Sequence, residues 1–131
     1  MVKTRLAQVA FKPERKVTQL CLSLDGSYLA WAEQGGHLSL IHFPVDEAAL
    51  VPRSWKAEGS IVGLCNRGQR FFALDDINGL SCLDMDGTVA WSVEVLGGGH
   101  SLYCGPHDMA VIDSLGRLYR VDYSGKITDL T

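Results

Sequence analysis

The chain has 131 residues, of which 47% are hydrophobic and 21% are charged, values that are typical of a globular protein with a core and exclude global disorder. No run of about twenty apolar residues is present, so the sequence predicts no membrane-spanning helix. The first residues are not followed by an apolar segment of the secretory type, so we expect a cytoplasmic protein whose four cysteines are reduced thiols.

Charge is unevenly distributed along the chain, although the net charge is only −3. Residues 1–16 hold five basic residues and one acidic residue, whereas the remainder holds seven basic and fourteen acidic residues. The basic residues of this arm are Lys3, Arg5, Lys12, Arg15 and Lys16. Such an arm can bind nucleic acid, or it can dock on an acidic face of its own or a neighbouring subunit. We favour docking, because no larger basic field and no aromatic stacking platform accompany the arm.

Apolar runs separated by turn signals predict a succession of short β-strands. The turn signals are rich in glycine, aspartate and asparagine, as in Asp25-Gly26-Ser27 and Asp86-Gly87. Pro44 precedes the weak strand at 50–56 and Pro52 lies within it, which suits a sheet edge, and residues 44–49 are too few for a stable helix. The predicted strands, in chain order, span residues 2–11, 17–24, 28–32, 37–43, 50–56, 61–65, 71–74, 80–83, 89–95, 100–104, 109–112, 117–123 and 126–130.

Three landmarks recur in the same order along the chain, which predicts an internal repeat. They are a cysteine late in a first strand, a glycine before a third strand, and a large apolar residue in a fourth strand. Their offsets of 36 to 44 residues, with four strands in each unit, match the period of a propeller blade. The landmark residues are Cys21, Cys65 and Cys104; Gly36, Gly79 and Gly116; and Trp55, Trp91 and Ile127.

Two segments resemble known propeller repeats. Residues 24–30, LDGSYLA, resemble the S-x-D-G-x-x-L-A turn of WD-repeat propellers, and residues 79–91 resemble the G-x-x-x-x-L-D…G…W pattern of quinoprotein-like propellers. The resemblance implies blade geometry and the common role of such propellers as interaction platforms. The Trp-Asp signature of WD repeats is absent from the chain.

We therefore predict an all-β domain of about three four-stranded antiparallel propeller blades. An N-terminal arm would cover residues 1–16, and the blades would cover 17–59, 60–96 and 97–131. Propellers close with about four to eight blades, so three blades leave two apolar faces in water. We expect a protein partner to cover them, either a second copy of the chain or the remainder of a larger propeller. The segment 2–11 could add a strand to the last blade.

The candidate site residues lie in the predicted turns. Asp76, Asn78, His107 and Asp113 are the positions from which one end of a central channel could bind a ligand. The favoured function is a non-catalytic protein–protein interaction or assembly module. The alternative is an enzyme or carbohydrate-binding propeller with its site in the channel of an assembled ring. Acidic residues at the turns are otherwise expected to form a solvated rim.

No metal or cofactor site is expected. Residues 84–88 begin like a calcium loop, but the glutamate that such a loop requires is not at the correct spacing. The repeated cysteines Cys21, Cys65 and Cys104 could bind a soft metal only if they met. Equivalent positions in separate blades are expected to be too far apart, so these cysteines are interpreted as small apolar residues. The histidines are interpreted as solvated residues at strand ends.

Overall fold

The computed structural model describes residues 13–42 and 52–130, and within these residues the chain forms twelve strands and no helix. The same residues contain no helix that is long and apolar enough to cross a membrane. The strands are β1 (Val17–Leu22), β2 (Tyr28–Glu33), β3 (His37–His42), β4 (Arg53–Lys56), β5 (Ile61–Arg67), β6 (Arg70–Asp75), β7 (Gly79–Asp84), β8 (Val89–Glu94), β9 (Gly99–Cys104), β10 (Asp108–Asp113), β11 (Leu118–Asp122) and β12 (Ile127–Leu130). The strand predicted at 2–11 lies outside the described residues.

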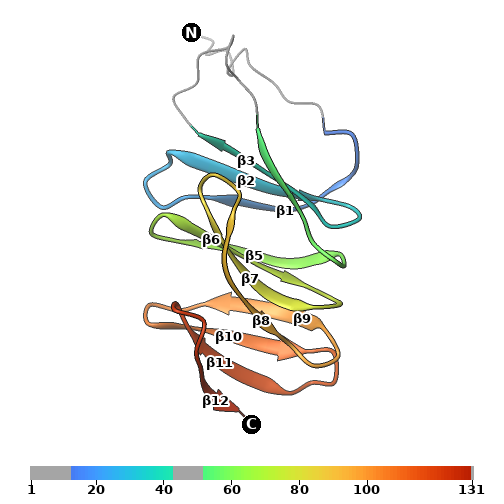
Figure 1. Cartoon of the computed structure of the whole chain (residues 1–131), viewed down its shortest axis with the longest axis vertical. Coiled ribbons are helices and arrows are strands. Elements are labelled where there is room, and N and C mark those ends of the chain that lie inside the picture. The colour runs from blue at the N-terminus through green and yellow to red at the C-terminus, as the bar shows by residue number, and fades with distance from the viewer. Residues whose placement is uncertain (1–12, 43–51, 131) are drawn as a thin grey trace, which may run out of the picture.

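The strands form three four-stranded antiparallel sheets in which sequence neighbours are hydrogen-bonded. The first sheet holds β1–β4, the second holds β5–β8 and the third holds β9–β12. Figure 1 shows the three sheets stacked face to face, with the second sheet in the middle. The first strands β1, β5 and β9 pack side by side through the stack. The predicted fold class, all-β with three four-stranded antiparallel blades, is confirmed.

Two apolar cores hold the stack together, one on each face of the second sheet. Strand β6 serves both cores because side chains alternate between the faces of a strand. Phe71 and Ala73 face the first sheet, whereas Phe72 and Leu74 face the third sheet. All four side chains are at most 1% exposed. A strand that is buried on both faces therefore reads as the continuous apolar run that the sequence shows.

The cysteines correct two expectations, that all four are reduced thiols and that equivalent positions in separate blades are too far apart to meet. Cys65 and Cys104 form a disulfide between the second and third sheets, with their Cα atoms 6.5 Å apart, so these two are not free thiols. The strand register explains why they meet. Cys65 pairs with Phe72 and faces the third sheet, whereas Cys104 pairs with Met109 and faces the second.

The three repeated cysteines are thus not all equivalent. Cys21 pairs with Ala30 and faces the second sheet, as Cys65 faces the third, but in the third sheet the corresponding position is Tyr103. Cys104 lies one residue further along, and a shift of one residue moves a side chain to the opposite face. The landmark alignment from the sequence was therefore wrong by one residue in the third unit.

Candidate functional site

The second strand of each sheet ends in a buried acid. Glu33, Asp75 and Asp113 end β2, β6 and β10 and are 7%, 2% and 1% exposed, respectively. Asp75 and Asp113 were expected in a solvated rim, and that interpretation was wrong for both. The Asp75 and Asp113 carboxylates accept hydrogen bonds from the chain that follows them, because buried polar groups require partners.

Asp113 has the most complete set of partners. Its Oδ1 accepts hydrogen bonds from the amides of Leu115 at 2.9 Å and Arg117 at 2.8 Å. Its Oδ2 accepts from Arg117 Nε at 2.8 Å and from the Tyr119 hydroxyl at 2.9 Å. Burial by itself raises the pKa of Asp113, but the bonds from Arg117, Tyr119 and Leu115 outweigh it and lower the pKa to about 2. This carboxylate therefore organises the turn and is not available to a ligand.

Asp75 shapes the equivalent turn of the second sheet in the same way. Its Oδ1 accepts hydrogen bonds from the amides of Ile77 at 2.9 Å and Asn78 at 2.6 Å. Ile77 and Leu115 thus occupy the same position, two residues after a buried acid. Both side chains point away from the core, with 63% of Ile77 and 72% of Leu115 exposed.

The linker between the second and third sheets passes between these two turns. The Val95 amide donates to the Asn78 carbonyl at 2.9 Å, and the Ser114 amide donates to the Gly98 carbonyl at 3.0 Å. The Ser114 hydroxyl also donates to the carbonyl of Gly97. Leu96 lies on this linker with its side chain 62% exposed.

Ile77, Leu96 and Leu115 together form what we term the turn-end patch. A Cβ atom placed on Gly97 would lie 3.7 Å from Leu115 Cγ, and one placed on Gly98 would lie 3.0 Å from the Ile77 amide nitrogen. The linker glycines therefore allow the two turns to approach on either side of Leu96. This patch was not predicted from the sequence. Its signal is an apolar residue two positions after the acid that ends a strand, repeated in consecutive units.

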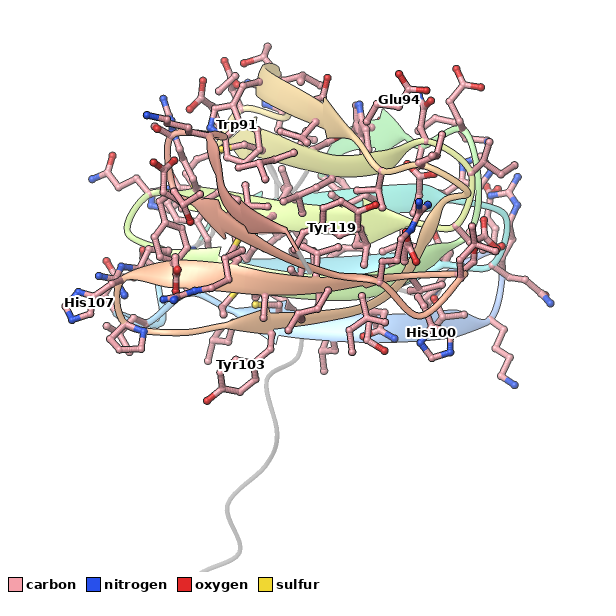
Figure 2. The ribbon with its side chains drawn as sticks, turned by 90° about the horizontal axis from the view of Figure 1, so that it is seen from below. Trp91, Glu94, His100, Tyr103, His107 and Tyr119 are labelled. Atoms are coloured by element: carbon pink, nitrogen blue, oxygen red, sulfur yellow. A yellow bond between two sulfur atoms is a disulfide. The ribbon has the colours of Figure 1, made fainter. Side chains whose placement is uncertain are left out.

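The predicted channel residues are divided between the two ends of the strands. Asp76, Asn78 and Asp113 lie at the end that carries the turn-end patch, where Asp76 Oδ1 accepts from the Ser60 amide at 2.9 Å. His107 lies in the turn between β9 and β10, at the opposite end of β10 from Asp113. Figure 2 shows His107 on the far side of the molecule from His100, which is close to the Asp113 end. The four positions do not meet at one end.

The basic arm is described only in part. Lys3, Arg5 and Lys12 lie outside the described residues. Arg15 and Lys16 are exposed just before β1. The Arg15 amide donates to Glu33 Oε1 at 3.2 Å, and its guanidinium lies 3.7 Å from Glu14. The described part of the arm is therefore anchored at the first buried acid.

The outward face of the third sheet carries a second group of exposed apolar side chains. Tyr103 is 72% exposed, Leu118 is 40% exposed and Ile112 is 38% exposed. Strand register places all three with Ala110 on the face away from the second sheet. Figure 2, which views the molecule from the third-sheet end, shows Tyr103 projecting away from the body. We term these four residues the outer third-sheet face.

Two polar hollows lie among the described residues. A hollow of about 320 Å³ beside β7 and β8 is lined by Asn78, Ser81, Ser92 and Glu94 among others. A wider one near Arg70 holds the Arg70–Asp84 ion pair at 3.2 Å. Within residues 13–42 and 52–130, no three metal-ligating side chains lie together.

Comparison with known proteins identifies the fold but not a family. No family model and no curated protein matches the sequence. BamB from Moraxella catarrhalis matches with a TM-score of 0.74 and 14% identity over 92% of this chain and 38% of that one. The computationally designed Ika4 protein matches with a TM-score of 0.76 and 10% identity, over 92% of this chain and 74% of that one.

A third similar structure is BBS1N in its complex with ARL6DN, with a TM-score of 0.63, 14% identity, and coverage of 79% of this chain and 35% of that one. Identities this low show the fold alone, and that fold is β-propeller-like. No WD-repeat family is shown by these matches. The chain spans 38% of the length of BamB and 35% of BBS1N, so it corresponds to part of each of those structures.

Proposed function

We propose that this chain is a non-catalytic assembly module, in which the outer third-sheet face of one copy packs against the first sheet of a second copy. The proposal rests on an internal comparison of equivalent faces. Ala30 of the first sheet is 0% exposed and Phe72 of the second is 1% exposed, because the next sheet covers each. Ala110 occupies the same position in the third sheet, and Tyr103 beside it is 72% exposed. This exposure supports a face on the third sheet that no sheet of the described residues covers.

The first sheet carries the complementary half of the same contact. Leu20, Leu64 and Leu102 occupy equivalent positions in the three sheets. Each pairs with the residue that lies two positions before the buried acid of its sheet. Leu64 packs against the core shared with the first sheet, and Leu102 packs against the core shared with the second. Within the described residues no sheet packs on the outward face of the first sheet, where Leu20 is 67% exposed and Leu22 is 57% exposed, although Trp31, which pairs with Leu20, is only 7% exposed.

A contact between a third sheet and a first sheet joins two different surfaces, and such contacts close into a ring when the rotation permits it. Two copies would supply six sheets, which lies within the range of about four to eight blades found in closed propellers. Burying exposed apolar side chains on both surfaces would provide the driving force. The similar structures, of which this chain spans only part, are consistent with a fold completed by further sheets.

The oligomeric state tests the proposal. We expect light scattering after size exclusion to give about twice the chain mass of 14.3 kDa. Tyr103→Glu and Leu20→Glu should each yield folded monomers, because each places a charge in one half of the contact. Mixing the two variants should restore part of the dimer, since one of the two junctions then joins unchanged surfaces.

Leu115→Glu is the matched control, because Leu115 is equally exposed but lies outside both contact faces. This variant should remain a dimer. A wild-type protein that stays monomeric at every concentration, or a Tyr103→Glu variant that keeps the wild-type mass, would refute the assembly.

A further inference from the structure

We propose that the turn-end patch is a separate interaction surface, which binds a segment of another protein whose apolar side chains are flanked by lysine or arginine. This inference does not depend on the assembly proposed above, because the patch lies at the strand ends and the assembly uses sheet faces. Three large apolar side chains, Ile77, Leu96 and Leu115, are more than 60% exposed there. Grouped exposed apolar residues mark interaction sites in soluble proteins.

Hydrogen bonds to buried acids and between the linker and the turns hold the patch in place. Asp75 and Asp113 lie beneath its two turns and bind the amides of Ile77 and Leu115, both at 2.9 Å. The linker that carries Leu96 is bonded to both turns, through Asn78 on one side and Ser114 on the other. A surface that is already ordered loses little conformational entropy when it binds, so its apolar area can contribute to affinity.

The charges beside the patch are acidic. Glu58 and Glu94 are exposed and form no ion pair with any other described residue. Glu58 precedes Gly59, whose added Cβ atom would lie 2.2 Å from Asp76 Oδ1 and 2.8 Å from Ile77 Cγ1, so this part of the chain lies beside the patch. Glu94 pairs in register with Gly79, next to the turn that carries Ile77. A basic flank on the partner segment would therefore be attracted to both sides of this surface.

The basic residues at this end do not cancel that acidic border. Arg15, Lys16 and Lys56 flank the first sheet, whereas the patch lies over the second and third sheets. Arg117 is at the patch side, but its guanidinium is 2.8 Å from the Asp113 carboxylate and is neutralised by it. An acidic or purely apolar partner segment would lack the complementary charge.

A synthetic peptide with three leucines flanked by two lysines at each end is the probe for this surface. Titrated into ¹⁵N-labelled wild-type protein, the peptide should shift the amide signals of Ile77, Leu96 and Leu115. These shifts should exceed those of residues within the strands of the third sheet. The same peptide with glutamate in place of lysine should bind at least about tenfold more weakly.

Two variants separate the apolar and the charged contributions. Ile77→Ser combined with Leu115→Ser should weaken binding about tenfold or more, because exposed side chains are truncated while the core is unchanged. Glu58→Gln combined with Glu94→Gln should weaken binding less and should make it less sensitive to salt. Tyr103→Glu, which targets assembly, should leave the affinity of each chain for the peptide unchanged.

Three results would each overturn the inference. The lysine peptide fails to bind wild-type protein, the glutamate peptide binds equally well, or the shifts map to residues other than the turn-end patch. Loss of peptide binding in Tyr103→Glu would also contradict it, since the peptide would then occupy the assembly face. Because assembly is scored by mass and peptide binding by amide shifts, one proposal can fail while the other stands.

Discussion

Asp113 shows how a single buried carboxylate determines the shape of a turn. Four hydrogen bonds reach its two oxygens, from Leu115, Tyr119 and, twice, from Arg117. Removing such partners leaves a buried group unsatisfied, which costs more than the bonds themselves contribute. The Asp113 carboxylate therefore acts on structure, and through Leu115 it also positions one third of the turn-end patch.

Replacing Asp113 by asparagine should change the acid stability of the protein. The pKa of Asp113 is lowered to about 2, so its ionised form stabilises the fold above about pH 4, the range of an unfolded aspartate. That stabilisation is lost as the pH falls through about 2. Asp113→Asn should lower the melting temperature at pH 7 by on the order of 5 °C and reduce its dependence on pH between about 4 and 2.

Thermal melts of both proteins across this pH range give the measurement. Hydrogen bonds from Ser27 also lower the pKa of Asp25 to about 2, but Asp25 is present in both proteins and cancels in the difference. Tyr119→Phe removes one of the four donors, so its melting temperature should lie between those of wild type and Asp113→Asn. Parallel melting curves for wild type and Asp113→Asn would contradict the assignment.

At the scale of elements, the last turn of each later sheet rests on the outer strand of the sheet before it. Gly87, between β7 and β8, lies over β4, where its added Cβ atom would be 3.5 Å from the Ser54 carbonyl oxygen. Gly125, between β11 and β12, lies over Trp91 of β8. Both glycines have φ near +90°, a conformation that other residues adopt only with strain. The repeated turn glycine thus has a packing role between neighbouring sheets.

Alanine at Gly125 should destabilise the protein more than alanine at Gly116. Both positions have positive φ, +91° and +84°, so both variants pay a similar backbone cost. A Cβ atom at Gly125 would lie 2.7 Å from Trp91 Cδ2, whereas none of the protein lies within 4 Å at Gly116. We expect Gly125→Ala to lose about 1–3 kcal/mol more of unfolding free energy, measured by urea denaturation. Equal losses would show that the third sheet does not rest on Trp91.

For the whole molecule, the stack depends on its middle sheet. The second sheet contributes to both cores, so the first and third sheets are connected only through it within the described residues. The Cys65–Cys104 disulfide adds a covalent link across the junction of the second and third sheets. Such bonds persist in oxidising compartments, so the cytoplasmic location expected from the sequence stays a prediction.

Breaking the disulfide should weaken the whole fold. The bond closes a loop across 39 residues. The chain-entropy account assigns such a closure about 4 kcal/mol of stabilisation, which is an upper value. Urea unfolding with reductant, or with Cys65→Ser and Cys104→Ser together, should show a loss of about 2–4 kcal/mol. Reductant should have no effect on the double variant.

Counting reactive thiols provides an independent check. Cys21 and Cys82 are free, so the denatured, unreduced protein should be alkylated twice, and the reduced protein four times. Four alkylations without reductant would show that the two cysteines remain thiols.

Local signals in the sequence predicted most of the fold and little of the site. Turn residues such as Asp25-Gly26-Ser27 act within a few positions, so strand positions could be predicted from them. The interval between the predicted strands at 61–65 and 71–74 was too long, because Arg67 and Arg70 pair across the turn and extend both strands. Asp76 and Asn78 were placed correctly in a turn, but the exposed Ile77 between them was not recognised as part of a surface.

The sequence by itself determined the number and order of the sheets, because the two-residue alternation and the turn chemistry act over short distances along the chain. Only the tertiary structure decided which faces meet. A shift of one residue in register turned Cys104 toward Cys65, and the packing of neighbouring sheets buried Asp75 and Asp113 instead of leaving them solvated. Burial depends on what the rest of the chain places opposite a residue, and that information is not local. The same reason explains why Tyr103 remains exposed whereas its counterparts Cys21 and Cys65 are partly buried by the next sheet.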